Sequence, residues 1–255
     1  MNILKSVSLI ALSLLAVVSC ACSEPVVYDV EVVAEYPHDT QSYTQGLFFD
    51  DGKLYESTGL KGKSTFRCVD LTTGKALKRM DFDKKYFLEG SVMFDGNLYI
   101  LTWESRVAFV YDAATLEYKN TWKYPREGWG LTTDGKRLIA SDGSAYLYFM
   151  DDKFAQKEKI QVTFNGRPVR YLNELEYIDG KIWANVYTAD EIVIINPKNG
   201  EVEGIINCRG LLPDQLRTSD TDVLNGIAYN PKDGKIYLTG KNWPRMYEIR
   251  LKKRK

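Results

Sequence analysis

Short apolar runs joined by tight turn signals make up most of the chain after residue 27. Five Asp-Gly pairs each stand between two such runs. The first pair, for example, stands between the runs at residues 46–49 and 54–55. An Asp-Gly pair in this setting predicts a two-residue type I′ hairpin, because glycine adopts positive φ without a steric penalty. The pairs are Asp51-Gly52, Asp95-Gly96, Asp134-Gly135, Asp179-Gly180 and Asp233-Gly234.

These hairpins recur with a nearly constant spacing. Their glycines are 44, 39, 45 and 54 residues apart, which is typical of four-stranded propeller blades. The last repeat has only three strand-like runs, whereas residues 28–36 form a strand-like run that belongs to no repeat. We therefore predict an all-β, five-bladed β-propeller, closed by the N-terminal strand, which leaves no open sheet edge there. An open β-sandwich is the alternative, but it does not explain the spacing.

An export signal precedes the repeats. Lys5 is followed by a mostly apolar run at 7–18 and by Cys20 after small residues, which resembles the lipobox of bacterial lipoproteins. The apolar run is too short to span a bilayer. An ordinary secretory signal cut near Ala21 stays open, and either signal exports the protein, facing the periplasm or the cell surface. The predicted segments are a lipoprotein signal peptide at 1–19, a linker at 20–27 lipidated on Cys20, and a propeller catalytic domain at 28–252.

Composition restricts both partners and chemistry. Lys plus Arg number 34 and Asp plus Glu number 34, so no net charge attracts nucleic acid, and the membrane is reached only through the lipid. His38 is the single histidine, which supports neither a typical catalytic zinc shell nor a Ser-His-Asp triad. Cys68 and Cys208 are expected to be buried free thiols, although an exported protein can form a disulfide. A catalytic site in this chain must therefore move protons with a carboxyl group.

The turn glycines place polar and aromatic residues at one rim of the predicted ring. Inner strands begin about seven residues before each glycine, and second strands end seven residues after it, at the same rim. The residues before are Gln45, Glu89, Gly128, Asn173 and, nine before the fifth glycine, Asn225; those after are Gly59, Trp103, Asp142, Tyr187 and Lys241. Gly46, Gly90 and Gly226 follow three of the first set, and we expect the backbone there to approach a ligand closely. Such a rim is typical of a small-molecule site, and Glu89 is the best-placed carboxyl group, with Glu174 second.

Eight short strings spread over all the repeats resemble the glutaminyl cyclases of plants and bacteria. Each string alone is weak, but their order and spacing through the whole mature chain are specific. They are YTQGL at 43–47, FLEG at 87–90, EGWGL at 127–131, SDGS at 141–144, NELE at 173–176, ANV at 184–186, LNGIA at 224–228 and TGKNWP at 239–244.

This resemblance implies a glutaminyl-peptide cyclotransferase, which converts the N-terminal glutamine of peptides or proteins into pyroglutamate and releases ammonia. It implies that Glu89 is the general acid and base. From the single histidine and scattered cysteines, we expect no cofactor for catalysis. The substrate-binding residues that the resemblance implies are Gln45, Trp103, Trp129, Asn173 and Lys241. Tyr187 stands where the family usually has tryptophan. Because tyrosine keeps a flat face for stacking, we also expect Tyr187 to bind the substrate.

Two other functions stay open. Glu89, Asn173 and Asn225 could hold the metal of a calcium-dependent lactone hydrolase, and a non-catalytic propeller could serve as a binding platform. We expect no catalytic metal, leave a structural calcium ion open, and expect a monomer.

Overall fold

The computed structural model describes residues 24–254, so the predicted signal peptide and Cys20 lie outside the described residues. Within this range the regular structure is β apart from one short 3₁₀ turn, η1 (Asp214–Leu216). No helix in this range has the length and apolarity that a membrane crossing requires. The prediction of an all-β protein is confirmed.

Three antiparallel sheets of four strands follow one another along the chain. In each sheet the strands lie side by side in chain order, so every connection is a hairpin. The first sheet is β2 (Thr44–Asp50), β3 (Lys53–Thr58), β4 (Thr65–Val69) and β5 (Ala76–Asp81). The second is β6 (Leu88–Phe94), β7 (Asn97–Thr102), β8 (Val107–Asp112) and β9 (Tyr118–Lys123). The third is β10 (Leu131–Thr133), β11 (Leu138–Ala140), β12 (Tyr146–Met150) and β13 (Gln156–Gln161).

The remaining long strands form one eight-stranded sheet, in the order β16-β17-β18-β19-β1-β22-β21-β20. Its strands are β16 (Leu172–Ile178), β17 (Lys181–Val186), β18 (Glu191–Ile195), β19 (Val202–Asn207), β1 (Val26–Pro37), β22 (Arg245–Lys253), β21 (Lys235–Gly240) and β20 (Leu224–Asn230). A separate short hairpin consists of β14 (Thr163–Phe164) and β15 (Arg167–Pro168). The N-terminal strand β1 pairs antiparallel with β22 and in parallel with β19, so it joins the two ends of the chain.

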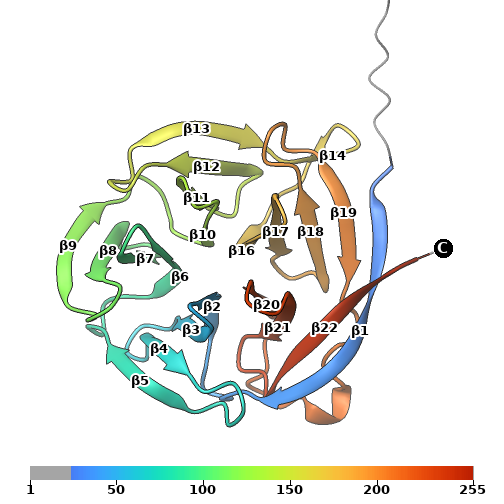
Figure 1. Ribbon diagram of the computed structural model, residues 1–255, viewed down its shortest axis with the longest axis horizontal. Coiled ribbons are helices and arrows are strands. Elements are labelled where there is room, and N and C mark those ends of the chain that lie inside the picture. The colour runs from blue at the N-terminus through green and yellow to red at the C-terminus, as the bar shows by residue number, and fades with distance from the viewer. Residues whose placement is uncertain (1–23, 255) are drawn as a thin grey trace, which may run out of the picture.

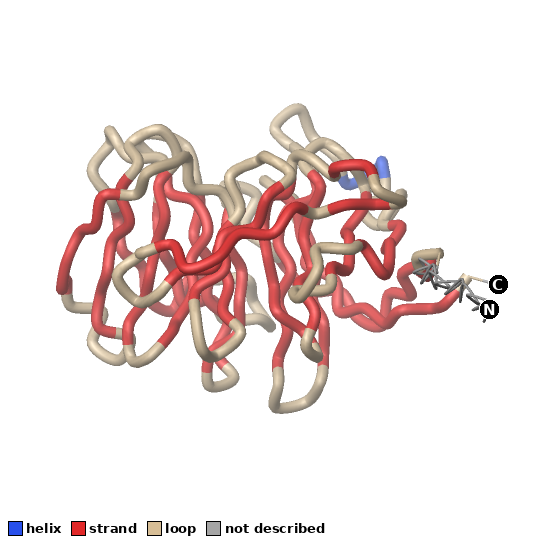
Figure 2. Tube along the Cα trace, turned by 90° about the horizontal axis from the view of Figure 1, so that it is seen from above, coloured by secondary structure: helices blue, strands red, loops and turns tan. Residues whose placement is uncertain are grey.

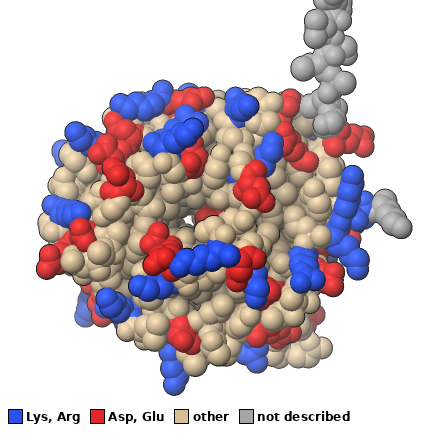
Figure 3. All heavy atoms as spheres, in the orientation of Figure 1, with Lys and Arg blue, Asp and Glu red and all other residues tan. Residues whose placement is uncertain are grey.

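The sheets surround a central axis in a nearly closed ring (Figure 1). Strands β2, β6, β10, β16 and β20 lie nearest the axis, and each contacts the next, with β20 also contacting β2. Figure 2 shows that the strands run along this axis and that the loops gather at its two ends. On the face shown in Figure 3, side chains of both charges are interspersed around a small central opening.

The hydrophobic core lies between neighbouring sheets and not at the axis. Phe66 of the first sheet and Leu98 of the second belong to one cluster, and Ile139 and Ile182 link the third sheet to the large one. The alternation of strand side chains explains this arrangement, since each sheet buries both of its faces against its neighbours. Cys68 and Cys208 are buried and free, as expected.

The turn prediction is confirmed for three hairpins and wrong in detail for two. Asp and Gly both have positive φ at 51–52, 95–96 and 179–180, as a type I′ turn requires. At Asp134 and Asp233 only the following glycine has positive φ. There the strands end earlier, so four residues separate β10 from β11 and β20 from β21. In the first of these loops, the Asp134 carboxylate accepts hydrogen bonds from the N–H groups of Lys136 and Arg137, which stabilises the longer turn.

Candidate active site

A cavity of about 190 Å³ opens at the ring end where the inner strands begin. All seven residues predicted for the pocket line it, together with two that were not predicted, Tyr43 and Phe87. The lining residues are Tyr43, Gln45, Phe87, Glu89, Trp103, Trp129, Asn173, Tyr187 and Lys241.

Three polar residues that line this cavity come from the innermost strands. Gln45 is on β2, Glu89 on β6 and Asn173 on β16, and their exposed fractions are only 3%, 4% and 3%. Each stands within a register shift between the first and second strands of its sheet. A β-bulge redirects a side chain from the regular alternation. The bulges therefore help to bring three polar groups from different sheets to one place.

Aromatic rings and one lysine form the wall. Tyr43 packs edge to face on Phe87, with ring centroids 6.1 Å apart, and Phe87 packs on Trp103 at 5.5 Å. On the other side, the rings of Trp129 and Tyr187 are 5.7 Å apart. Tyr43 and Phe87 stand two residues before Gln45 and Glu89. Counting two residues further back from the turn glycines therefore finds both.

The glycines beside the polar residues serve sheet packing, and the expectation that they admit a ligand is wrong for Gly46 and Gly90. A Cβ atom on Gly90 would lie 2.4 Å from the Leu131 N and 2.6 Å from the Trp129 O. The Gly90 N–H donates to this Trp129 oxygen over 2.7 Å. A Cβ on Gly46 would likewise lie 2.7 Å from the Ser91 N. The missing side chains let adjacent inner strands touch, which sets Glu89 beside Trp129.

The Glu89 carboxyl group has no hydrogen-bond or salt-bridge partner within residues 24–254, so its oxygens are available to a bound molecule. Burial raises the pKa of this carboxyl group well above its usual value; the Lys241 charge opposes the rise and the Glu127 charge adds to it. A raised pKa brings the proton equilibrium of a carboxyl group closer to neutral pH, where the group can both take and return a proton.

Two further polar atoms of the lining are buried and have no partner in the described part of the chain. They are Nε1 of Trp129, which is a donor, and Oδ1 of Asn173, which is an acceptor. Buried polar groups are normally hydrogen-bonded. A donor and an acceptor left open in one cavity therefore point to a polar ligand. Trp103, in contrast, already donates its Nε1 proton to the Glu127 carboxylate over 2.8 Å.

Other polar residues considered from the sequence lie outside the cavity. The Glu174 carboxyl oxygens accept the backbone N–H groups of Leu47 at 3.3 Å and Ile227 at 2.9 Å, so this residue ties three inner strands together. Burial and the neighbouring Glu176 raise the pKa of Glu174. Asn225 is buried, and its side-chain amide donates to the Thr44 carbonyl oxygen at 2.8 Å and to Oε1 of Gln45 at 3.2 Å. Asn225, which the lactone hydrolase alternative places with Glu89 and Asn173, is not among the residues that line the cavity.

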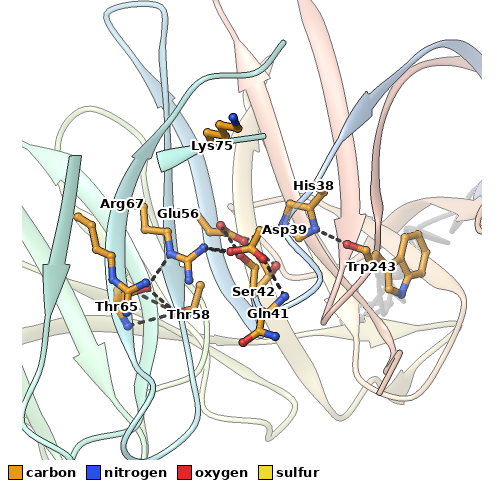
Figure 4. Close-up of polar contacts among 12 residues, drawn as sticks. His38, Asp39, Gln41, Ser42, Glu56, Thr58, Thr65, Arg67, Lys75 and Trp243 are labelled. Atoms are coloured by element: carbon orange, nitrogen blue, oxygen red, sulfur yellow. Dashed lines mark hydrogen bonds and ion pairs between the residues drawn. The ribbon is translucent and has the colours of Figure 1, made fainter. Parts of the chain in front are cut away.

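A buried ionic cluster that includes His38, Glu56 and Arg67 contacts the segment that carries Tyr43; Figure 4 shows these three residues. His38 Nδ1 lies 2.7 Å from the Trp243 carbonyl oxygen, and Nε2 lies 3.0 Å from Oε1 of Glu56. Both partners are acceptors, so both ring nitrogens donate and the imidazole is charged. Burial alone would lower the pKa of His38, but the charge and hydrogen bond of Glu56 raise it overall.

The same cluster reaches both residues that flank Tyr43. Glu56 accepts hydrogen bonds from the hydroxyl groups of Ser42 at 3.0 Å and Thr44 at 2.8 Å. Arg67 donates to the Ser42 hydroxyl at 2.9 Å and to the Asp39 carboxylate at 2.7 Å, as Figure 4 shows. His38 lies in the loop that follows β1, where it is part of the support for one cavity wall.

Taken together, the cavity offers one unpartnered carboxyl group, a buried lysine, amides and an aromatic wall. This set suits a small polar molecule that needs a proton moved while its flexible part is held by flat rings. Within residues 24–254, no three side chains of His, Cys, Asp or Glu gather as a metal-binding group.

Comparisons with known proteins agree on one family. The family model described as glutamine cyclotransferase matches residues 5–251. A glutaminyl-peptide cyclotransferase of Arabidopsis thaliana is 45% identical over 231 residues, which are 88% of this chain and 72% of the relative. The crystal structure of the Myxococcus xanthus glutaminyl cyclase superposes with a TM-score of 0.85 at 35% identity, over 91% of this chain and 100% of that one.

Proposed function

The chain belongs to the glutamine cyclotransferase family, and on that premise we propose that Glu89 moves the proton in its reaction. The activity is that of a glutaminyl-peptide cyclotransferase, with peptides or proteins that begin with glutamine as substrates. The observation that carries the proposal for Glu89 is its buried carboxyl group in the aromatic cavity, which has no partner among residues 24–254.

The reaction requires no external nucleophile. The α-amino nitrogen of the substrate attacks its own γ-carboxamide carbon, a new C–N bond closes the lactam ring, and the old C–N bond breaks to release ammonia. An α-amino group is about one-tenth neutral at pH 7, which costs only about 1.4 kcal/mol. Proton transfer is the harder part, because the attacking amine must lose a proton and the departing nitrogen must gain one.

Glu89 serves both transfers in this proposal. Its carboxylate takes a proton from the attacking amine and then returns it to the leaving nitrogen. The raised pKa of the group, caused by burial, suits this double role. The aromatic wall holds the side chain in the conformation that closes the ring and excludes water.

The other polar lining residues bind the substrate. Lys241, Gln45 and the Nε1 proton of Trp129 are donors for the γ-carbonyl oxygen or the first peptide carbonyl, where negative charge develops. Asn173 Oδ1 is the acceptor left open, and it suits an N–H group of the substrate. Tyr187 supplies part of the wall through its contact with Trp129.

We also propose that the ring is a five-bladed propeller with β1 completing its last blade. The pairing of β1 with β22 and the succession of contacts among the inner strands support this architecture. We also propose that the protein is a monomer. It is exported and anchored through a lipid on Cys20, which rests on the sequence pattern alone. Replacing Cys20 with Ala should release a soluble, active protein, and acyl labelling that persists in this variant would contradict the assignment.

The test of function uses a synthetic peptide that begins with glutamine. Purified protein should release one equivalent of ammonia from each peptide, and the peptide should lose that mass. The same peptide acetylated at its amino group is the matched control, because it lacks the nucleophile. Initial rates should survive EDTA, since we propose catalysis without a metal. Loss of activity that calcium restores would favour the lactone hydrolase mechanism or a structural ion.

A further inference from the structure

The ammonium group of Lys241 is held by ring faces. Lys241 is 3% exposed, and its Nζ lies 4.8 Å from the centroid of the Tyr43 ring and 5.0 Å from that of the Tyr187 ring. In the described range, the Lys241 Nζ makes no salt bridge or hydrogen bond. A cation over aromatic faces is stabilised by the ring quadrupoles. No oxygen of residues 24–254 therefore occupies the N–H donors, which stay free for an oxygen of the substrate.

Asp222 fixes the position of the Tyr43 ring. The Tyr43 hydroxyl donates to Oδ2 of Asp222 over 2.6 Å, the length of a strong charge-assisted hydrogen bond. Burial first, and then this carboxylate, raise the pKa of Tyr43, so its hydroxyl keeps its proton and remains a donor. The other oxygen, Oδ1, accepts the Val223 N–H at 2.8 Å, which fixes the orientation of the carboxylate itself.

Asp222 also fixes the backbone of the lysine. The Asp222 N–H donates to the Lys241 carbonyl oxygen at 3.0 Å, and the Lys241 N–H donates to the Val223 carbonyl oxygen at 2.9 Å. The Asp222 carbonyl oxygen accepts the indole N–H of Trp243 at 2.9 Å. Asp222 thus acts on Lys241 in two ways. It binds the backbone of Lys241 directly, and it fixes the Tyr43 ring that contacts the ammonium group.

We propose that Asp222 is a positioning residue that places the Tyr43 ring against the Lys241 ammonium group, so that this group presents free donors to a carbonyl oxygen of the substrate. The inference rests on the proposed function. A carboxylate in direct contact with Lys241 would occupy the same donors and compete with the substrate oxygen. Asp222 acts from one residue further away and leaves them open. Burial lowers the pKa of Lys241 overall, and the charges of Glu89 and Asp222 oppose part of this fall.

The first test compares three variants of the full chain with a peptide that begins with glutamine. Asp222→Ala removes the acceptor, and Tyr43→Phe removes only the hydroxyl; each should lower kcat/KM by about tenfold, the effect of one strong hydrogen bond. Tyr36→Phe is the matched control, because Tyr36 donates a similar hydrogen bond to Glu248 at 3.0 Å and does not line the cavity. It should leave kcat/KM within about twofold of wild type. Thermal unfolding checks that each variant is folded.

The second test asks whether Asp222 acts through Lys241. In a Lys241→Met background, the further change Asp222→Ala should lower kcat/KM no more, because the group that it positions is gone. A further tenfold loss would overturn the inference, since it would show an effect independent of the lysine. Should Asp222→Ala fail to fold, Tyr43→Phe in the same two backgrounds gives the same comparison.

The outcomes separate this inference from the proposed function. If the wild-type protein does not cyclise the peptide, the proposed function fails. If wild type is active and Lys241→Met is impaired, but Tyr43→Phe and Asp222→Ala stay within about twofold of wild type, only the role of Asp222 is wrong.

Discussion

Replacing Glu89 with Gln changes one atom of a buried, unpartnered group. The amide has nearly the shape of the carboxyl group, and no described hydrogen bond of the Glu89 side chain is lost. The bond from the Ser57 hydroxyl, at 2.6 Å, goes to the backbone oxygen of residue 89 and survives. We therefore expect the variant to fold and to bind the peptide about as well as wild type.

The change in stability caused by Glu89→Gln has a predicted direction. Because burial raises the folded-state pKa of Glu89, wild type loses stability as pH rises from the ordinary value of 4.5 through the raised one. Gln cannot ionise, so Glu89→Gln lacks this loss and should be at least as stable as wild type at neutral pH. Urea unfolding at pH 5 and at pH 8 measures the difference.

The expected kinetic effect is large. General acid-base catalysis typically contributes roughly 10²–10⁴-fold, or about 3 to 5 kcal/mol in the barrier. The kcat for ammonia release should therefore fall at least about a hundredfold, with little change in peptide binding.

Glu174→Gln is the matched control. Its carboxyl group accepts two backbone N–H groups outside the cavity, so the change should cost stability, about 1–3 kcal/mol, and leave kcat within a few-fold. Retention of more than roughly a tenth of wild-type turnover by Glu89→Gln would refute the proton-transfer role. Equal kinetic damage from a folded Glu174→Gln would reassign the catalytic carboxyl group.

Three other substitutions and one change of pH have expected effects. Gly90→Ala should sharply lower the yield of folded protein, because its Cβ would lie 2.4 Å from the Leu131 N; a normal melting curve would contradict the packing role. Glu56→Gln should destabilise by about 3–5 kcal/mol, since it leaves the charged His38 buried without its partner. Wild-type stability should decline as pH rises from 6.5 through the raised pKa of His38; urea melts that show the same decline in Glu56→Gln would refute this assignment. A folded Trp103→Ala should lose on the order of 1 kcal/mol of transition-state binding beyond its buried area, and unchanged kcat/KM would limit Trp103 to packing.

The sequence alone predicted the features that depend on local pattern. Asp-Gly pairs between apolar runs marked the hairpins, because turn geometry is decided by a few adjacent residues. Their spacing then placed Gln45, Glu89 and Asn173 at equivalent positions, and the structure brings all three into one cavity. Equivalent positions converge in this way because the repeats are arranged around a common axis.

Only the tertiary structure decided the contacts between sheets. Tyr43 and Asp222 are 179 residues apart in the chain, and nothing in either local pattern indicates that they meet. The glycine at position 90 looked like access for a ligand, yet the neighbouring strand fills its space. His38 does lie in a loop, but nothing near it in the sequence indicates that it is buried against Glu56. Such contacts depend on how closely neighbouring sheets pack, which is fixed by the side chains of both partners together and so has no signature in either segment alone.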